Sequence, residues 1–191
     1  MTARGKIIII SAPSGCGKST IINEIIKNPD LRLEFSISAT TREPRRGETN
    51  GVNYYFMSVD EFKKAIADDM LIEYEEVYPG RFYGTPRSEI DRIRNRGRNI
   101  ILDIDVMGGI NVKNKFGNEA LSIFIQPPSI DALRQRLNDR GTDSPEAIAQ
   151  RVEKAGFEIS QSGKFDKIVI NDRLDVAIRE TEDLIKSFIN S

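Results

Sequence analysis

The stretch IIIISAPSGCGKST, residues 7–20, decides the fold. Its four isoleucines, β-branched and apolar at every position, are typical of a strand that is covered on both faces. The glycine-rich turn that follows fits the phosphate-binding pattern G-x-x-x-x-G-K-[ST], with Ala12 in place of the first glycine. Residues 19–27 then carry isoleucine at helical spacing. The turn therefore joins a buried strand to a helix, which is the context that the pattern requires.

The residues of this turn are suited to binding a nucleoside triphosphate. Gly15 and Gly17 allow positive φ, which points backbone N–H groups at phosphate oxygens, and the helix N-terminus adds its positive dipole end. We expect Lys18 to reach the β- and γ-phosphates and the Ser19 hydroxyl to bind Mg²⁺. The alternative is a glycine-rich turn with an incidental lysine. The residues expected to bind ATP here are Ala12, Pro13, Ser14, Gly15, Cys16, Gly17, Lys18, Ser19 and Thr20.

The rest of the chain extends the same architecture. Apolar runs at residues 100–104, 121–125 and 168–170 alternate with helical patterns. Such alternation predicts a three-layer α/β fold, a parallel sheet with helices on both faces. Residues 36–84 break the alternation with short, half-polar strands, and they contain all five tyrosines of the chain. We interpret this segment as a small inserted lobe with a polar pocket; the alternative is a strand-rich surface that suits tyrosine.

Several polar residues predict where helices begin. Ser58 and Glu61 form a capping-box pattern, and Ser129 is placed to cap a helix over residues 130–137. Thr85-Pro86 and Ser144-Pro145 each resemble an N-cap followed by proline at the first helical position. Arginines mixed with acidic residues over 87–98 predict a helix face that is exposed to solvent.

Composition limits the chemistry that remains. The 191 residues include 28 Lys and Arg against 29 Asp and Glu, so the net charge of −1 argues against nucleic-acid binding. With no histidine and one cysteine, histidine-dependent triads, imidazole metal sites and internal disulfides are excluded. No apolar run is long enough to cross a membrane, and no signal peptide is present, so we expect a cytoplasmic, single-domain protein. The oligomeric state is left open.

Charged residues outside the turn complete a phosphoryl-transfer site. Asp103 follows a buried strand and fits the acidic residue that completes a magnesium site, whereas Asp105 is as consistent with a cap as with a metal role. Guanidinium groups suit phosphate geometry and stabilise a transferring phosphoryl group. Arginines that could bind phosphate fall in two segments. The inserted lobe carries Arg42, Arg45 and Arg46. A short break at residues 141–144, which suggests a closing lid, is flanked by Arg134, Arg136, Arg140 and Arg151.

The chain resembles the guanylate kinase family. The segment Thr41-Arg42-x-x-Arg45-x-x-Glu48-x-x-Gly51-x-x-Tyr54-x-Phe56 is similar to that family's signature. The phosphate-binding turn, Leu102-Asp103-Ile104-Asp105, Arg140-Gly141-Thr142 and Val169-Ile170-Asn171-Asp172 follow in the family's order, so the resemblance covers residues 5–190. It implies the reaction ATP + GMP ⇌ ADP + GDP with Mg²⁺, and ATP and GMP as the small-molecule partners.

The resemblance also implies roles for individual positions. Ser38, Glu73 and Asp103 would contact guanine, and Asp103 would also reach the metal through water. Arg42, Arg45, Tyr54 and Tyr83 would hold the GMP phosphate, with Gly84 and Thr85 beside it. Arg136, Arg140 and Arg151 would clamp the ATP phosphates, and Asn171 would lie near adenine. The implied catalytic residues are Lys18, Arg42, Arg136, Arg140 and Arg151.

The expected organisation is a core of residues 1–35, 85–135 and 152–191, an acceptor-binding lobe over 36–84 and a lid over about 136–151. Two alternatives belong to other classes. A non-catalytic guanylate-kinase-like module that binds a phosphorylated peptide would have lost the phosphate-binding turn, which is intact here. A regulatory GTPase would carry an Asn-Lys-x-Asp segment, which is missing from the sequence. A small-molecule kinase with another acceptor is the nearest alternative.

Overall fold

The computed structural model describes residues 4–141 and 144–191. The chain divides into two compact units. Unit 1 comprises Glu34–Ile100 together with the N-terminal residues up to Lys6. Unit 2 comprises Ile7–Leu33 and Ile101–Ser191.

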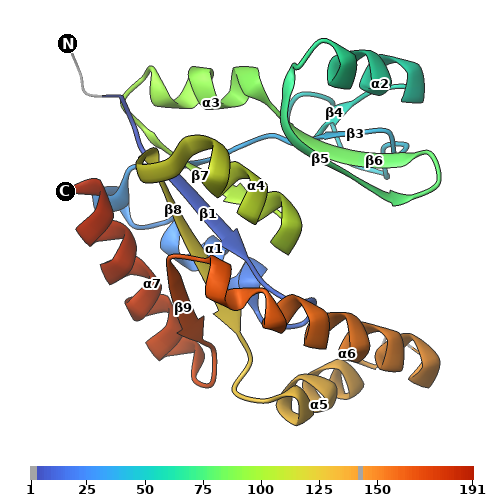
Figure 1. Ribbon diagram of the computed structural model, residues 1–191, viewed down its shortest axis with the longest axis vertical. Coiled ribbons are helices and arrows are strands. Elements are labelled where there is room, and N and C mark those ends of the chain that lie inside the picture. Colours follow the sequence, from blue (N-terminus) through green and yellow to red (C-terminus); the bar gives the residue numbers. More distant parts are fainter. Residues whose placement is uncertain (1–3, 142–143) are drawn as a thin grey trace. The chain divides into compact units, whose positions relative to one another are not determined.

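The larger sheet has five strands in the order β2-β7-β1-β8-β9 (Figure 1). β1 pairs in parallel with β8, where Ile8 lies opposite Leu121, and β8 pairs in parallel with β9. Apart from β2, which no apolar run predicts, each strand overlaps an apolar run of the sequence. Their bounds are β1 Ile7–Ser11, β2 Leu33–Phe35, β7 Asn99–Asp103, β8 Ala120–Gln126 and β9 Lys167–Ile170.

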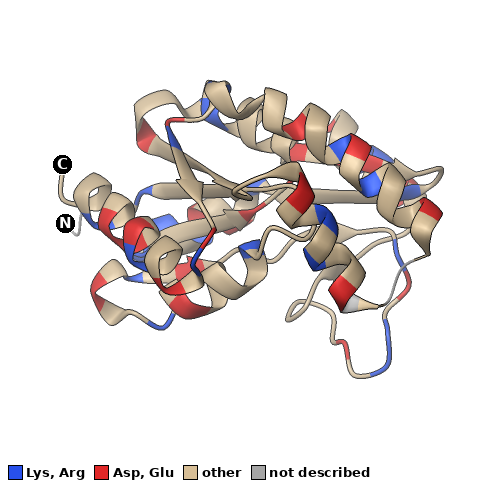
Figure 2. Cartoon of the chain, turned by 90° about the horizontal axis from the view of Figure 1, so that it is seen from below, with Lys and Arg blue, Asp and Glu red and all other residues tan. Residues whose placement is uncertain are grey.

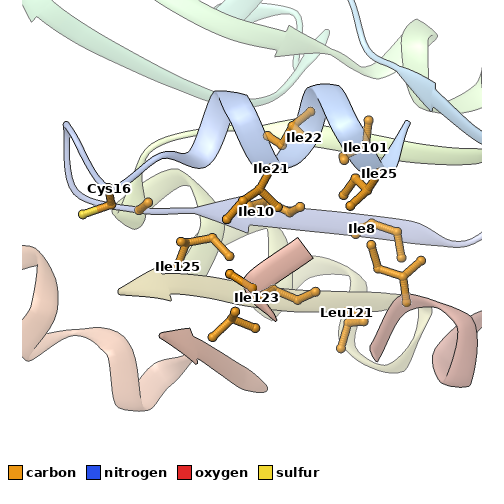
Figure 3. Close-up of a cluster of buried hydrophobic side chains, with 14 of the residues drawn as sticks. Ile8, Ile10, Cys16, Ile21, Ile22, Ile25, Ile101, Leu121, Ile123 and Ile125 are labelled. Atoms are coloured by element: carbon orange, nitrogen blue, oxygen red, sulfur yellow. The ribbon is translucent and has the colours of Figure 1, made fainter. Parts of the chain in front are cut away.

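Helices cover both faces of this sheet, which confirms the predicted three-layer α/β fold. Alternate strand residues point to opposite faces, so Ile123 and Ile125 pack in one cluster with α1 and α7 while Phe124 packs with α4 in another. Figure 3 shows the first cluster, in which Ile8 and Ile10 meet Ile21 and Ile25. The helices of unit 2 are α1 Lys18–Ile25, α4 Val106–Phe116, α5 Ile130–Arg140, α6 Pro145–Ser160 and α7 Leu174–Ile189, with short 3-10 turns at Pro29–Leu31, Gly117–Glu119 and Ser162–Lys164.

Unit 1 holds a second sheet of four strands in the order β4-β3-β6-β5. β3 runs parallel to β4 and antiparallel to β6, which is antiparallel to β5. The core of this unit forms where Phe62 of α2 stacks on Phe82 of β6, with ring centroids 5.3 Å apart, beside Ala39 and Leu71. The elements are β3 Ala39–Thr40, β4 Tyr55–Phe56, α2 Val59–Ala67, β5 Leu71–Tyr78, β6 Arg81–Pro86 and α3 Arg87–Arg94.

The helix starts agree with the sequence with one exception. The capping box of Ser58 and Glu61 is present, and the side chains of Ser129 and Ser144 each accept a backbone N–H at the start of their helices. The prediction for Thr85-Pro86 is wrong, because strand β6 continues through Pro86 and the helix begins at Arg87 without a side-chain cap. Thr85 is a buried strand residue instead.

The prediction that residues 87–98 expose their charges is wrong for two of them. Glu89 is 1% exposed and Arg94 is 3% exposed. The Arg94 guanidinium donates to the carbonyl of Gly5, which lies far away in the sequence. A mixed-charge pattern marks the helix but does not tell which of its charges have buried partners.

Basic and acidic residues are interspersed along the helices, as Figure 2 shows, in keeping with the small net charge. Among the described residues, no helix combines the length and the apolar character that a membrane span needs.

Candidate functional site in each unit

The turn between β1 and α1 is built on two glycines in the left-handed region. Gly15 has φ 90° and Gly17, the residue before α1, has φ 83°. A Cβ on Gly15 would come within 2.9 Å of Leu137, and one on Gly17 within 2.5 Å of the Asn171 amide nitrogen. Both positions therefore favour glycine for conformation, and at Gly17 the hydrogen-bonded Asn171 amide also leaves no room for a Cβ.

Lys18 lies at the start of α1 and reaches the end of β7. Its Nζ is 2.5 Å from Oδ1 of Asp103 and donates to the carbonyl of Ile104 at 3.3 Å. Both side chains are partly exposed. The structure thus brings together the lysine and the acid that the sequence predicts for phosphate and metal.

These residues line a cavity of about 630 Å³ in unit 2. All nine residues of the predicted ATP-binding turn contribute to it. Arg136 of α5 and Glu158 of α6 also line it, and Glu158 was missed by the sequence analysis. Nothing in the helical pattern of residues 145–160 singles out Glu158, because its contribution depends on where α6 packs.

Asn171 supports the phosphate-binding turn through a hydrogen bond to its backbone. Its side-chain amide, almost completely buried, donates to the carbonyl of Cys16 at 2.8 Å. Arg136 in turn donates to the backbone carbonyl of Asn171 at 2.8 Å. Asn171, expected near adenine, is therefore placed against the backbone of the phosphate-binding turn.

Two predicted arginines of the lid segment are described. Arg136 lies on α5, and Arg151 on α6 donates to the Ser14 hydroxyl at 3.4 Å. Thr142 and Asp143 lie outside the described residues, and Arg140 is described only as the last residue of α5. Both described arginines of this segment thus contact the turn or the residue that supports it.

Asp105 caps α4. Its Oδ1 accepts hydrogen bonds from the N–H groups of Met107 and Gly108, at 2.8 and 3.0 Å. Of the two roles that the sequence left open, the structure provides the cap.

The Cys16 thiol is buried in the turn, and burial raises its pKa to about 12. The positive charges of Arg136 and Lys18 act in the opposite direction but do not compensate. Cys16 is thus a small packing residue of the turn whose thiol is not activated by the charges around it.

We expect Cys16 in the folded chain to react with iodoacetamide at pH 8 about 10²–10³-fold more slowly than in the unfolded chain, because only the thiolate reacts. As the chain has one cysteine, mass spectrometry of the whole protein in buffer and in concentrated urea gives both rates. Equal rates in the two solutions would show that the thiol is accessible and ionises normally.

Unit 1 carries the predicted acceptor-phosphate residues around Arg42. Its guanidinium forms a bidentate pair with Glu48, both N–O distances being 2.9 Å, and lies 5.3 Å from the centre of the Tyr54 ring. Tyr54 makes an edge-on contact with Tyr83, with ring centroids 6.1 Å apart. The hydrogen bonds from Arg42 and from the N–H of Arg45 lower the pKa of Glu48 to about 2. Glu48, a residue of the signature segment for which the sequence predicts no role, orients Arg42.

The predicted guanine-binding residues lie on the same unit. Glu73 of β5 is 9% exposed, and its Oε1 accepts a hydrogen bond from the buried Thr85 hydroxyl at 2.6 Å. Gly84 leaves no room for a side chain, because a Cβ would lie 2.8 Å from the Glu73 carbonyl. Ser38 precedes β3, and its carbonyl accepts the N–H of Tyr55 at 2.9 Å.

Comparison with known proteins gives one consistent result. The sequence model of the guanylate kinase family matches residues 4–188. The chain is 52% identical to the guanylate kinase of Bacteroides fragilis over 188 residues, which is 98% of this chain and 92% of that protein. It is 50% identical to the guanylate kinase of Porphyromonas gingivalis, over 96% of this chain and 98% of that protein. The crystal structure of guanylate kinase from Anaplasma phagocytophilum aligns with a TM-score of 0.76 and 28% identity, covering 99% of this chain and 88% of that one.

Proposed function

The chain belongs to the guanylate kinase family, and on this premise we propose that it transfers the γ-phosphoryl group of ATP to GMP. An oxygen of the GMP phosphate forms the new bond to phosphorus, and the bond to the β–γ bridging oxygen breaks, which releases ADP and GDP. The attacking oxygen is already ionised at neutral pH, so the reaction needs positioning and charge stabilisation rather than a strong base. A chain without histidine can supply both.

We assign ATP to unit 2. The phosphate-binding turn presents N–H groups, and Lys18 supplies a positive charge beside them. Arg136 and Arg151 contact Asn171 and Ser14 respectively, which supports their role as clamps on the ATP phosphates. Arg140 joins this set by its position in the sequence, and residues 136–151 form the proposed lid.

We assign GMP to the lobe of residues 36–84 in unit 1. Arg42, already oriented by Glu48 and Tyr54, is the proposed ligand of the GMP phosphate, with Arg45 and Tyr83 beside it. Glu73 and Ser38 are the proposed guanine ligands, and Thr85 holds the carboxylate of Glu73 in place. Asp103, proposed to assist both guanine and metal, belongs to unit 2.

Mg²⁺ fits the oxygen-bearing groups of the phosphate-binding turn. Ser19 and Asp103 both line the unit 2 cavity and offer a hydroxyl and a carboxylate, the ligand types that Mg²⁺ prefers. Within the described residues no cluster of three or more potential metal ligands is found. In nucleotide sites Mg²⁺ is held mainly by phosphates and water, and we propose that Asp103 acts through water. When bound, Mg²⁺ would neutralise charge that develops on the phosphates.

The observation that carries the proposal is the intact phosphate-binding turn, with Lys18 next to Asp103, in a chain of this family. A non-catalytic module would have no use for these two charged groups at the turn. We further propose a cytoplasmic location, because ATP and GMP are nucleotides of that compartment.

A coupled assay of ADP release tests this function. With ATP and Mg²⁺, we expect GMP to be phosphorylated far faster than AMP, CMP or UMP, and chelation of Mg²⁺ by EDTA to stop the reaction. ATP alone gives the hydrolysis background. Another monophosphate as the best acceptor would favour the alternative of a kinase with different specificity.

A further inference from the structure

Glu89 in the first turn of α3 is a buried carboxylate of unit 1 with hydrogen bonds to both of its oxygens. It is 1% exposed, and each of its oxygens accepts two donors. Oε1 accepts the Tyr55 hydroxyl at 2.9 Å and Nε of Arg92 at 2.8 Å. Oε2 accepts the N–H of Ile37 at 2.9 Å and Nη2 of Arg92 at 2.8 Å.

These four donors keep the carboxylate charged. Burial by itself would raise the pKa of Glu89, but the hydrogen bonds from Arg92, Ile37 and Tyr55 lower it on balance. Burial and the neighbouring carboxylate raise the pKa of the Tyr55 hydroxyl, which therefore remains a donor. A buried acid that is held this firmly fixes the groups that bond to it.

The groups that Glu89 fixes stand on both sides of Ser38. Ser38 directly precedes β3, and its carbonyl joins the parallel pairing of β3 with β4, whereas Ile37 lies before that pairing and has its N–H bonded to a side chain. The N–H of Ile37, just before Ser38, bonds to Glu89, and the carbonyl of Ser38 accepts the N–H of Tyr55. The hydroxyl of that same Tyr55 bonds to Glu89. One carboxylate thus anchors the Ser38 backbone from two directions.

We propose that Glu89 is a positioning residue for guanine recognition, which acts by holding Ser38 where its hydroxyl meets the base. This inference rests on the proposed function and deepens it, since the buried Glu89 is not among the proposed substrate ligands and acts through Ser38. Tyr55 contributes to the same positioning, because its hydroxyl bonds to Glu89 and its N–H bonds to the Ser38 carbonyl. Arg92 orients the carboxylate and keeps it ionised.

Replacing Glu89 with glutamine tests the proposal. An amide has one acceptor oxygen and one NH₂ group, so the two donors that bond to the replaced oxygen would face the NH₂ group and lose their acceptor. We expect Glu89→Gln to raise the KM for GMP about tenfold, the scale of a lost buried hydrogen bond. We expect kcat and the KM for ATP to stay within about twofold, because the residues proposed for ATP belong to unit 2.

A double-mutant cycle separates positioning from general support of the fold. If Glu89 acts through Ser38, the effect of Glu89→Gln on the KM for GMP falls below about threefold when Ser38 is alanine, because coupled residues are not additive. An effect of the same size in both backgrounds would overturn the proposal. So would an unchanged KM for GMP, or a loss that appears equally in kcat and in the KM for ATP.

Two further variants complete the design. Asp91→Asn is the matched control, since Asp91 lies on the same helix, pairs with Arg4 at the surface and is expected to leave all constants unchanged. Should Glu89→Gln fail to fold in a thermal melt, Tyr55→Phe removes a single donor and decides the question by the same cycle with Ser38. A wild-type chain that does not phosphorylate GMP would overturn the proposed function and this inference together. An active wild type with unaffected variants would overturn the inference alone.

Discussion

Replacing Lys18 with alanine is expected to lower kcat by about 10²–10³-fold or more, the cost of one lost charge-stabilising donor in a transition state. Lys18 supplies the positive charge of the phosphate-binding turn, and its amine lies 2.5 Å from Asp103, the last residue of β7. It is not a core residue, so the fold should survive. The assay of ADP release with saturating ATP and GMP measures the loss, and a thermal melt checks the fold.

Lys27→Ala is the matched control for this prediction. Lys27 follows the same helix and pairs with Glu24 at 2.7 Å, but both side chains are largely exposed, so its loss should change neither kcat nor stability appreciably. If Lys18→Ala retained more than about a tenth of the wild-type kcat, the turn would not stabilise the transferring phosphoryl group as one donor normally does.

The sequence was most informative where local pattern and buried position coincide. The isoleucine run and the glycine turn predicted β1 and α1, and three further apolar runs predicted β7, β8 and β9. Strands β1, β7 and β8 are buried on both faces, so hydrophobicity alone marks them. Strand β9, the last of the sheet, differs from the buried strand that its apolar run predicts, because Ile168 and Ile170 are exposed. The turn residues of the predicted ATP site also line one cavity, because a single segment carries most of that site.

Features that depend on distant partners were not predictable in this way. Glu89 looked like one more surface charge, yet its partners Ile37 and Tyr55 lie 52 and 34 residues away in the sequence. Thr85 looked like a helix cap, and antiparallel pairing of β5 with β6 places it opposite Glu73 instead. Glu158 reached the cavity through the packing of α6. In each case tertiary pairing decided the role, and no local spacing encodes it.

The pairing of Thr85 with Glu73 has a consequence for the base that is accepted. Guanine presents N1–H and the 2-amino group on one edge, and a carboxylate can accept both. The Thr85 hydroxyl orients the Glu73 carboxylate at 2.6 Å, in surroundings that leave it only 9% exposed. Adenine has neither donor on that edge, so its unprotonated N1 would face the carboxylate.

We therefore expect kcat/KM for GMP to exceed that for AMP by about 10⁴–10⁵, because a buried site that hydrogen-bonds its substrate rejects an analogue that leaves its groups unpaired. Glu73→Gln should narrow this gap, mainly by weakening the use of GMP, since an amide offers one acceptor and one donor.

Glu76→Gln on the same strand is the control, because Glu76 is exposed and its acceptor role toward the N–H of Gly80 can pass to the amide oxygen. The measurement is kcat/KM for both nucleotides with all three proteins. The ratio of kcat/KM for GMP to kcat/KM for AMP decides the outcome. If Glu73→Gln keeps this ratio within about threefold of wild type, the change is far below the discrimination that one substrate hydrogen bond supports, and guanine is recognised by other residues.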